Sequence, residues 1–126
     1  MKTGSFFTAK GNGRISIARS SPRGIVVPAY RPLAPGSWFN SVGYEEYRKL
    51  YFAQLNKLDP LKTWEDLHNL VNGNEPIILC WERLNTPGNW CHRQMVAEWF
   101  NKTLGFEVLE VGSTKKPAEK TQAGLF

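Results

Sequence analysis

Side chains that can do chemistry are concentrated in two short segments of this 126-residue chain. Cys80 and Glu82 stand at the end of a short apolar run, and Cys91, His92 and Arg93 are consecutive further along. A thiol near a cation or at a helix N-terminus has a lowered pKa and becomes a better nucleophile or metal ligand. A partly buried carboxyl group can hold and transfer a proton at neutral pH. These five residues are therefore the candidate catalytic residues.

Each of the five also has a purely structural interpretation. Cys80 lies in an apolar run, where a cysteine is commonly a small buried hydrophobic side chain. Cys91 fits a packed position at a helix start, and His92 fits a capping or solvent-facing position. Glu82 and Arg93 together fit an ion pair that braces a turn. Both a chemical site and a set of structural contacts stay open.

The same segments contain ligands of the kind that Zn²⁺ accepts, with water in a fourth position. These are Cys80, Cys91 and His92, and their spacing fits no standard zinc finger. Adjacent residues on a helix point about 100° apart, so Cys91 and His92 need an irregular turn to bind one ion. We therefore predict neither a metal site nor another cofactor. Zn²⁺ is the ion that these three residues would accept if they bound one.

The chain carries no recognisable signal for export or membrane insertion. No apolar run approaches the roughly 20 residues that span a bilayer, and residues 1–13 lack the apolar stretch of a secretion signal. We therefore expect a cytoplasmic protein without a membrane partner. Cysteines stay reduced in that compartment, so we expect Cys80 and Cys91 to be free thiols or ligands and not a structural disulfide.

The excess positive charge of +5 is carried by the N-terminal third of the chain. Residues 1–44 contain six of the sixteen Lys and Arg residues and none of the eleven acidic residues. A field of this kind favours nucleotides or nucleic acid, although the same charges are also compatible with solvated loops. No glycine-rich phosphate motif follows a predicted strand. The candidate anion-binding residues lie in one loop and are Arg19, Ser20, Ser21 and Arg23.

Apolar periodicity and turn residues predict alternating strands and helices. The expected strands are 14–18, 77–81 and 106–111. The expected helices are 44–58, 63–71 capped by Thr63, and one from the N-cap Asn89 to about Gly105. This order predicts a small Rossmann-like, three-layer α/β domain with a short, mostly parallel sheet. Ligands bind at the carboxyl ends of such strands, so Arg19 should meet Cys80 and Glu82.

The domain is expected to occupy residues 1–111, and residues 112–126 are polar and should form a flexible tail. The tail ends in Gln122, Leu125 and Phe126, which resemble the peptide by which replication and repair proteins bind the sliding clamp. Such an apolar pair can enter a pocket while the glutamine fixes its orientation. An accidental apolar terminus is the alternative.

Several segments together resemble the α/β family catalogued as domain of unknown function 488, over about residues 14 to 110. The specific part is a Cys-x-Glu strand end followed by Cys-His-Arg at a helix start. The resemblance implies a compact α/β domain with a role connected to nucleic acids or their bases. The segments that carry it are Ile17–Gly24, Leu33–Pro35, Tyr44–Tyr47, Leu79–Glu82 and Trp90–Trp99.

The leading hypothesis is an enzyme that modifies, removes or repairs bases of a nucleic acid, or acts on a nucleotide. In it Arg19 and Arg93 hold an anion, Cys91 or a bound ion supplies the reactive centre, and Glu82 moves protons. The alternative is a non-catalytic adaptor that binds DNA or the sliding clamp and uses the same polar residues to brace its fold.

Overall fold

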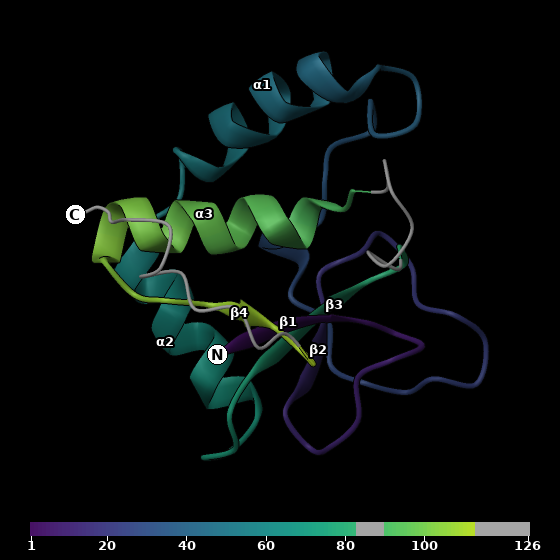
Figure 1. Ribbon diagram of the computed structural model, residues 1–126, viewed down its shortest axis with the longest axis vertical. Helices are drawn as coiled ribbons and strands as arrows, with labels where there is room; N and C mark the ends of the chain where they lie inside the picture. The colour runs from purple at the N-terminus through teal and green to yellow at the C-terminus, as the bar shows by residue number, and fades with distance from the viewer. Residues whose placement is uncertain (83–89, 113–126) are drawn as a thin grey trace.

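Residues 1–82 and 90–112 are described by a computed structural model of the chain, which Figure 1 shows as a ribbon. Within them the chain alternates strands and helices in the order expected of an α/β domain. The elements are β1 (Lys2–Ser5), β2 (Arg14–Ser16), the 3-10 helix η1 (Arg31–Leu33), α1 (Tyr44–Leu55), α2 (Pro60–Leu70), β3 (Ile77–Cys80), α3 (His92–Leu104) and β4 (Leu109–Glu110).

The four strands form one sheet in the order β2-β3-β1-β4. Every strand pair in it is parallel, with Ser5 opposite Cys80 and Ser16 opposite Leu79. The ends of β1, β2 and β3 therefore lie at one edge of the sheet. The predicted α/β class with a parallel sheet is confirmed.

The three α-helices contribute to one hydrophobic cluster on one face of the sheet. On that face Ile15, Ile17 and Ile78 join the larger hydrophobic cluster, to which α1, α2 and α3 all contribute. On the opposite face Leu79 packs with Phe6 and other residues from non-helical segments. The layer on this second face is thus built from loops, which fits a chain too short to cover both faces of a sheet with helices.

β1 was not predicted, although it lies inside the sheet between β3 and β4. Its sequence Lys-Thr-Gly-Ser contains no apolar side chain, so apolar alternation gives no signal. Gly4 fits because the chain passes close by: a Cβ at this position would lie 2.9 Å from the Cβ of Ala9.

The second helix begins earlier than predicted. The side chain of Asp59 caps it by accepting a hydrogen bond from the N–H of Lys62, and Pro60 occupies the first turn. Thr63, the predicted cap, is buried inside the helix and donates to the carbonyl of Asp59 at 2.8 Å.

In the described part of the chain no helix has the length and apolar character that crossing a membrane requires.

Candidate functional site

A pocket of about 690 Å³ opens at the carboxyl ends of β2 and β3. The segment after β2, the loop before α1, α1 itself and the start of α3 complete its lining. Six of the nine predicted catalytic and anion-binding residues converge here, as the strand-end argument requires. Those that line the pocket are Arg19, Ser20, Cys80, Glu82, Cys91 and His92.

A disulfide joins Cys80 and Cys91, so the expectation of two free thiols is wrong for this state of the protein. Cys80 ends β3 and Cys91 immediately precedes α3, and both side chains are buried. The two residues lie close together because α3 begins at the edge of the sheet where β3 ends. Nucleophilic or ligand chemistry at either sulfur therefore requires reduction to the dithiol.

The backbone at Cys91 is extended, with φ −147° and ψ 153°, and Cys91 is the N-cap of α3. Asn89, the predicted cap, lies outside the described residues. The N–H of Cys91 donates to Oε1 of Gln94 at 3.1 Å. Because Cys91 is not helical, the 100° separation expected between Cys91 and His92 does not apply. The Sγ of Cys91 lies 3.7 Å from Nδ1 of His92, so the irregular turn is present.

His92 is buried, and its Nε2 lies 2.7 Å from the carbonyl oxygen of Ile17. A carbonyl oxygen only accepts hydrogen bonds, so Nε2 carries the proton and Nδ1 keeps its lone pair. Burial, together with the charge of Arg93, lowers the pKa of His92 to about 4. The imidazole is therefore neutral near pH 7 and presents the unprotonated Nδ1 to Cys91.

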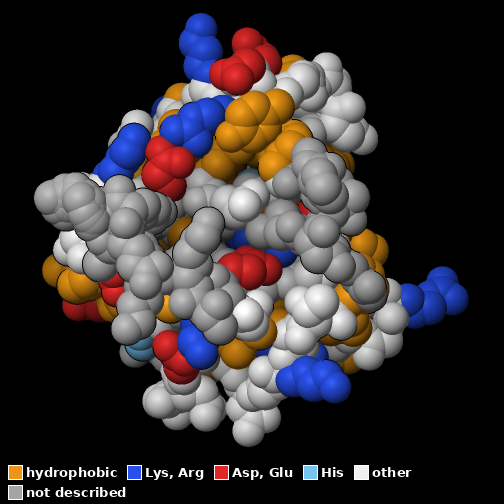
Figure 2. Space-filling view, in the orientation of Figure 1, with side chains coloured by type: hydrophobic (Ala, Val, Ile, Leu, Met, Phe, Trp, Pro, Cys, Tyr) orange, Lys and Arg blue, Asp and Glu red, His pale blue; other side chains and the backbone are white. Residues whose placement is uncertain are grey.

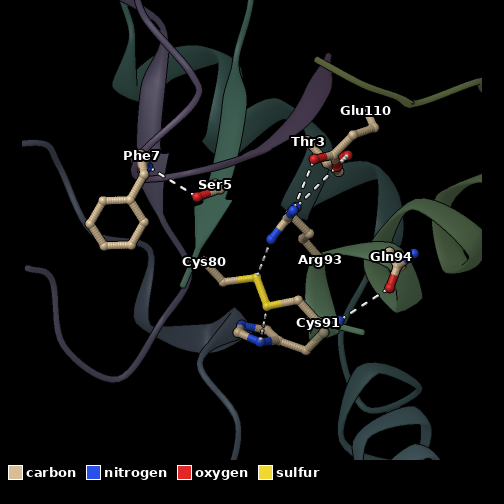
Figure 3. A network of polar contacts seen from close by, with 9 residues as sticks. Thr3, Ser5, Phe7, Cys80, Cys91, Arg93, Gln94 and Glu110 are labelled. Carbon is tan, nitrogen blue, oxygen red and sulfur yellow. Dashed lines mark hydrogen bonds and ion pairs between the residues drawn. A yellow bond between two sulfur atoms is a disulfide. The ribbon is translucent and has the colours of Figure 1, made fainter. Parts of the chain in front are cut away.

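Arg93 is completely buried and does not line the pocket. Its Nε and Nη2 donate to the two carboxylate oxygens of Glu110 at 3.0 and 2.8 Å, and its Nη1 lies 3.2 Å from the Sγ of Cys80. Figure 3 shows the guanidinium between Glu110 and the disulfide. Arg93 is therefore not placed to hold an anion in the pocket, as was expected. Its ion-pair partner is Glu110 and not Glu82. Among the described residues of the pocket lining, Arg93 donates a hydrogen bond only to Cys80, so that contact is its direct link to the site.

Glu82 and Arg19 are both exposed and belong to the mouth of the pocket. The partial burial expected for Glu82 is therefore absent. Arg19 donates from Nη1 to the carbonyl of Pro35 at 2.9 Å, and its guanidinium carbon lies 5.1 Å from the ring centroid of Phe39. Ser21 and Arg23 are exposed residues outside the pocket lining.

The aromatic wall of the pocket consists of four residues that line it, Phe39, Tyr47, Trp81 and Trp90. Trp81 is 42% exposed, and its Nε1 donates to the carbonyl of Ser20 at 2.8 Å. Trp90 packs edge to face on Tyr47, whose buried hydroxyl has a raised pKa because it is desolvated. Phe39 comes from the proline-rich loop. Nothing in the local sequence marks Phe39 or Tyr47 as pocket residues.

Three kinds of chemistry are open to this arrangement. The sulfurs of Cys80 and Cys91 can cycle between disulfide and dithiol. In the dithiol, Nδ1 of His92 can accept a hydrogen bond from the Cys91 thiol, and the N-terminus of α3 favours a thiolate at Cys91. Finally, two thiolates and one imidazole can bind a metal ion, since their ligand atoms lie within 4.8 Å of one another.

Two predictions concern regions away from the pocket. Figure 2 shows Lys and Arg side chains dispersed over the face in view, with no single basic patch on it. The predicted clamp-binding residues Gln122, Leu125 and Phe126 lie outside the described residues, as does the predicted tail 112–126 except for Gly112.

Comparisons with known proteins add no relative to this picture. The resemblance to the domain of unknown function 488 family accordingly stays a prediction from the motifs. No protein-family model matches the chain, and no similar curated protein or solved structure was found.

Proposed function

We propose that this chain is an enzyme that acts on a nucleotide or on an exposed base of a nucleic acid. Cys80, Cys91 and His92 form its reactive centre in the reduced state. The observation that carries the proposal is their position: these buried groups line the same pocket as exposed Arg19 and an aromatic wall.

The pocket suits a planar ligand with a negative charge. Its volume of about 690 Å³ is in the range of small-molecule sites. Trp81 and Phe39 line the pocket with 42% and 39% of their surface exposed, and stacking on an aromatic side chain stabilises a bound base by about 1–3 kcal/mol. The Arg19 guanidinium matches the geometry of a phosphate. A nucleotide combines these two features in one molecule.

The groups around the sulfurs divide the chemical work. His92 offers the unprotonated Nδ1 as a hydrogen-bond acceptor or metal ligand, because Ile17 holds the proton on Nε2. Arg93 stabilises negative charge on Cys80 from the side away from the pocket. Glu82 at the mouth exchanges protons with the ligand or with solvent.

The test is a product search with matched variants. Reduced protein is incubated with nucleotides and with single- and double-stranded DNA that carries normal and damaged bases, and the products are identified by mass spectrometry. We expect a product that Cys91→Ser and Glu82→Gln abolish while their circular dichroism spectra stay unchanged. Arg23→Gln, outside the pocket, should keep full activity. Absence of both product and nucleotide binding with the reduced wild-type protein contradicts the proposal.

A non-catalytic adaptor is the second candidate, and the buried Arg93–Glu110 pair favours it because it braces α3 against β4. In that case Cys91→Ser lowers the melting temperature without changing any reaction, and the partner is bound elsewhere. Copurification of a sliding clamp with the full chain, lost on removal of residues 122–126, supports this second function.

A further inference from the structure

The three ligand atoms of the pocket cluster lie close to one another. The Sγ atoms of Cys80 and Cys91 and a ring nitrogen of His92 all lie within 4.8 Å of one another. In a tetrahedral zinc site with bonds of about 2.3 Å to sulfur and about 2.0 Å to nitrogen, the two ligand types lie about 3.5 Å apart. The observed distance from Cys91 Sγ to His92 Nδ1 is 3.7 Å. The site therefore needs little movement beyond separation of the two sulfurs.

The contacts behind the cluster are those that orient metal ligands. A metal-bound histidine almost always donates its other ring N–H to a carbonyl or carboxylate, which fixes the tautomer. His92 does this with the Ile17 carbonyl and leaves Nδ1 toward the sulfurs. Arg93 supplies a hydrogen-bond donor 3.2 Å from Cys80 Sγ, which stabilises a thiolate there. Both partners are fixed by the fold before any ion binds.

We infer that the reduced protein binds one divalent transition-metal ion, Zn²⁺ in the first place, through Cys80 Sγ, Cys91 Sγ and His92 Nδ1. Three protein ligands leave one tetrahedral position, and it faces the pocket because all three residues line it. Water in that position becomes a nucleophile near neutral pH. The inference goes beyond the proposed function, because metal binding requires no substrate.

The experiment uses the full chain in two redox states. A dithiol reagent reduces the Cys80–Cys91 bond: the disulfide takes up two electrons and two protons, and the reagent becomes a cyclic disulfide. After anaerobic removal of reagent and metals, Co²⁺ is added and then displaced with Zn²⁺. We expect saturation at about one ion per chain, thiolate-to-cobalt charge-transfer absorption and release of protons. The oxidised protein has no thiolate to offer and should show none of these signals.

Variants identify the ligands. Loss of a partner behind a metal ligand already weakens binding by about 10- to 100-fold, so Cys91→Ser and His92→Gln should weaken it by at least about 100-fold. His68→Gln is the matched control, because His68 lies on α2 and is bonded through Nδ1 to the Trp64 carbonyl. If Cys91→Ser does not fold, the comparison between reduced and oxidised wild-type protein decides. A reduced wild-type protein without charge-transfer absorption, or with binding unaffected by His92→Gln, overturns the inference.

Failure of this inference is distinguishable from failure of the proposed function. Nucleotide binding is measured in the same reduced, metal-free sample through the fluorescence of Trp81 and Trp90, which line the pocket. Nucleotide binding without metal binding overturns only the metal site. Metal binding without binding of any nucleotide, with or without the ion, supports the metal site and overturns the proposed substrate class.

Discussion

Replacement of Arg93 by methionine should destabilise the fold far more than replacement of a half-buried arginine on the neighbouring helix α1. Arg93 is completely buried and makes two hydrogen bonds to Glu110 and one to Cys80. Removal of one partner of a buried ion pair costs about 3–5 kcal/mol. Glu110 remains 28% exposed and also accepts a hydrogen bond from Thr3. We therefore expect the lower end, a loss of about 3 kcal/mol.

The matched control is Arg48→Met. Arg48 forms a similar two-pronged contact with Glu98 on α3, but the two side chains are 35% and 33% exposed. Solvent-exposed pairs contribute about 0–1 kcal/mol, so this change should cost less than about 1 kcal/mol. Both variants are compared by urea unfolding at pH 7 with the disulfide intact. Equal losses in the two variants would refute the reasoning that burial of Arg93 makes its pair strong.

The Arg93 variant also separates bracing from an effect on the site. After reduction, loss of the guanidinium beside Cys80 should raise the midpoint of the thiolate absorbance in a pH titration, because a stabilising charge is gone. Arg48→Met should leave that midpoint unchanged. A midpoint that Arg93→Met does not move assigns Arg93 to the fold alone.

Three further changes test other parts of the structure. The pKa of His92 is about 4 in the fold, below its ordinary 6.5, because of burial and the charge of Arg93, so the unfolded chain takes up this proton first. The neutral His92 ring therefore contributes fully to the free energy of unfolding above pH 6.5, and this contribution is lost as the pH falls toward 4. At about 1.4 kcal/mol per pKa unit, the loss reaches up to about 3 kcal/mol. Urea unfolding of metal-free His92→Gln should lack this part of the pH dependence, and an unchanged dependence argues against a neutral buried imidazole. Gly4→Ala should destabilise the protein by about 1–3 kcal/mol, because its Cβ would lie 2.9 Å from that of Ala9; a thermal melt equal to wild type contradicts this packing. If the chain is the adaptor, removal of residues 122–126 should abolish binding to a sliding clamp in a pull-down while the melting temperature stays the same, and clamp binding by the shortened chain would refute the tail prediction.

The parts of the fold that could be predicted are those with local signals. The buried run that became β3 and the apolar stripe of α1 follow from spacing alone, and the structure places them within a few residues of the prediction. The rule that ligands bind at the carboxyl ends of parallel strands predicted that Arg19 and Cys80 would lie at one site, and both line the pocket. Location of the pocket was therefore accessible from the sequence.

The remainder depends on contacts between distant segments. β1 has no apolar pattern and exists because β3 and β4 pair with it on either side. The ion-pair partner of Arg93 could not be found, since Glu110 follows it by seventeen residues across a helix. Reduced cysteines were predicted from the expected cytoplasmic location. In the structure the end of β3 and the start of α3 lie close together, and the sulfurs of Cys80 and Cys91 form a disulfide.

Protection of Cys91 from alkylation tests the central claim most directly, which is that Cys80, Cys91 and His92 are the reactive centre of a nucleotide pocket. Reduced, metal-free protein is treated with iodoacetamide, with and without nucleoside monophosphates, and modification is followed by mass spectrometry. The account predicts that a nucleotide slows alkylation of Cys91 in a saturable way and that Arg19→Gln weakens this protection. Alkylation that no nucleotide slows, at the same rate in wild type and Arg19→Gln, would contradict it.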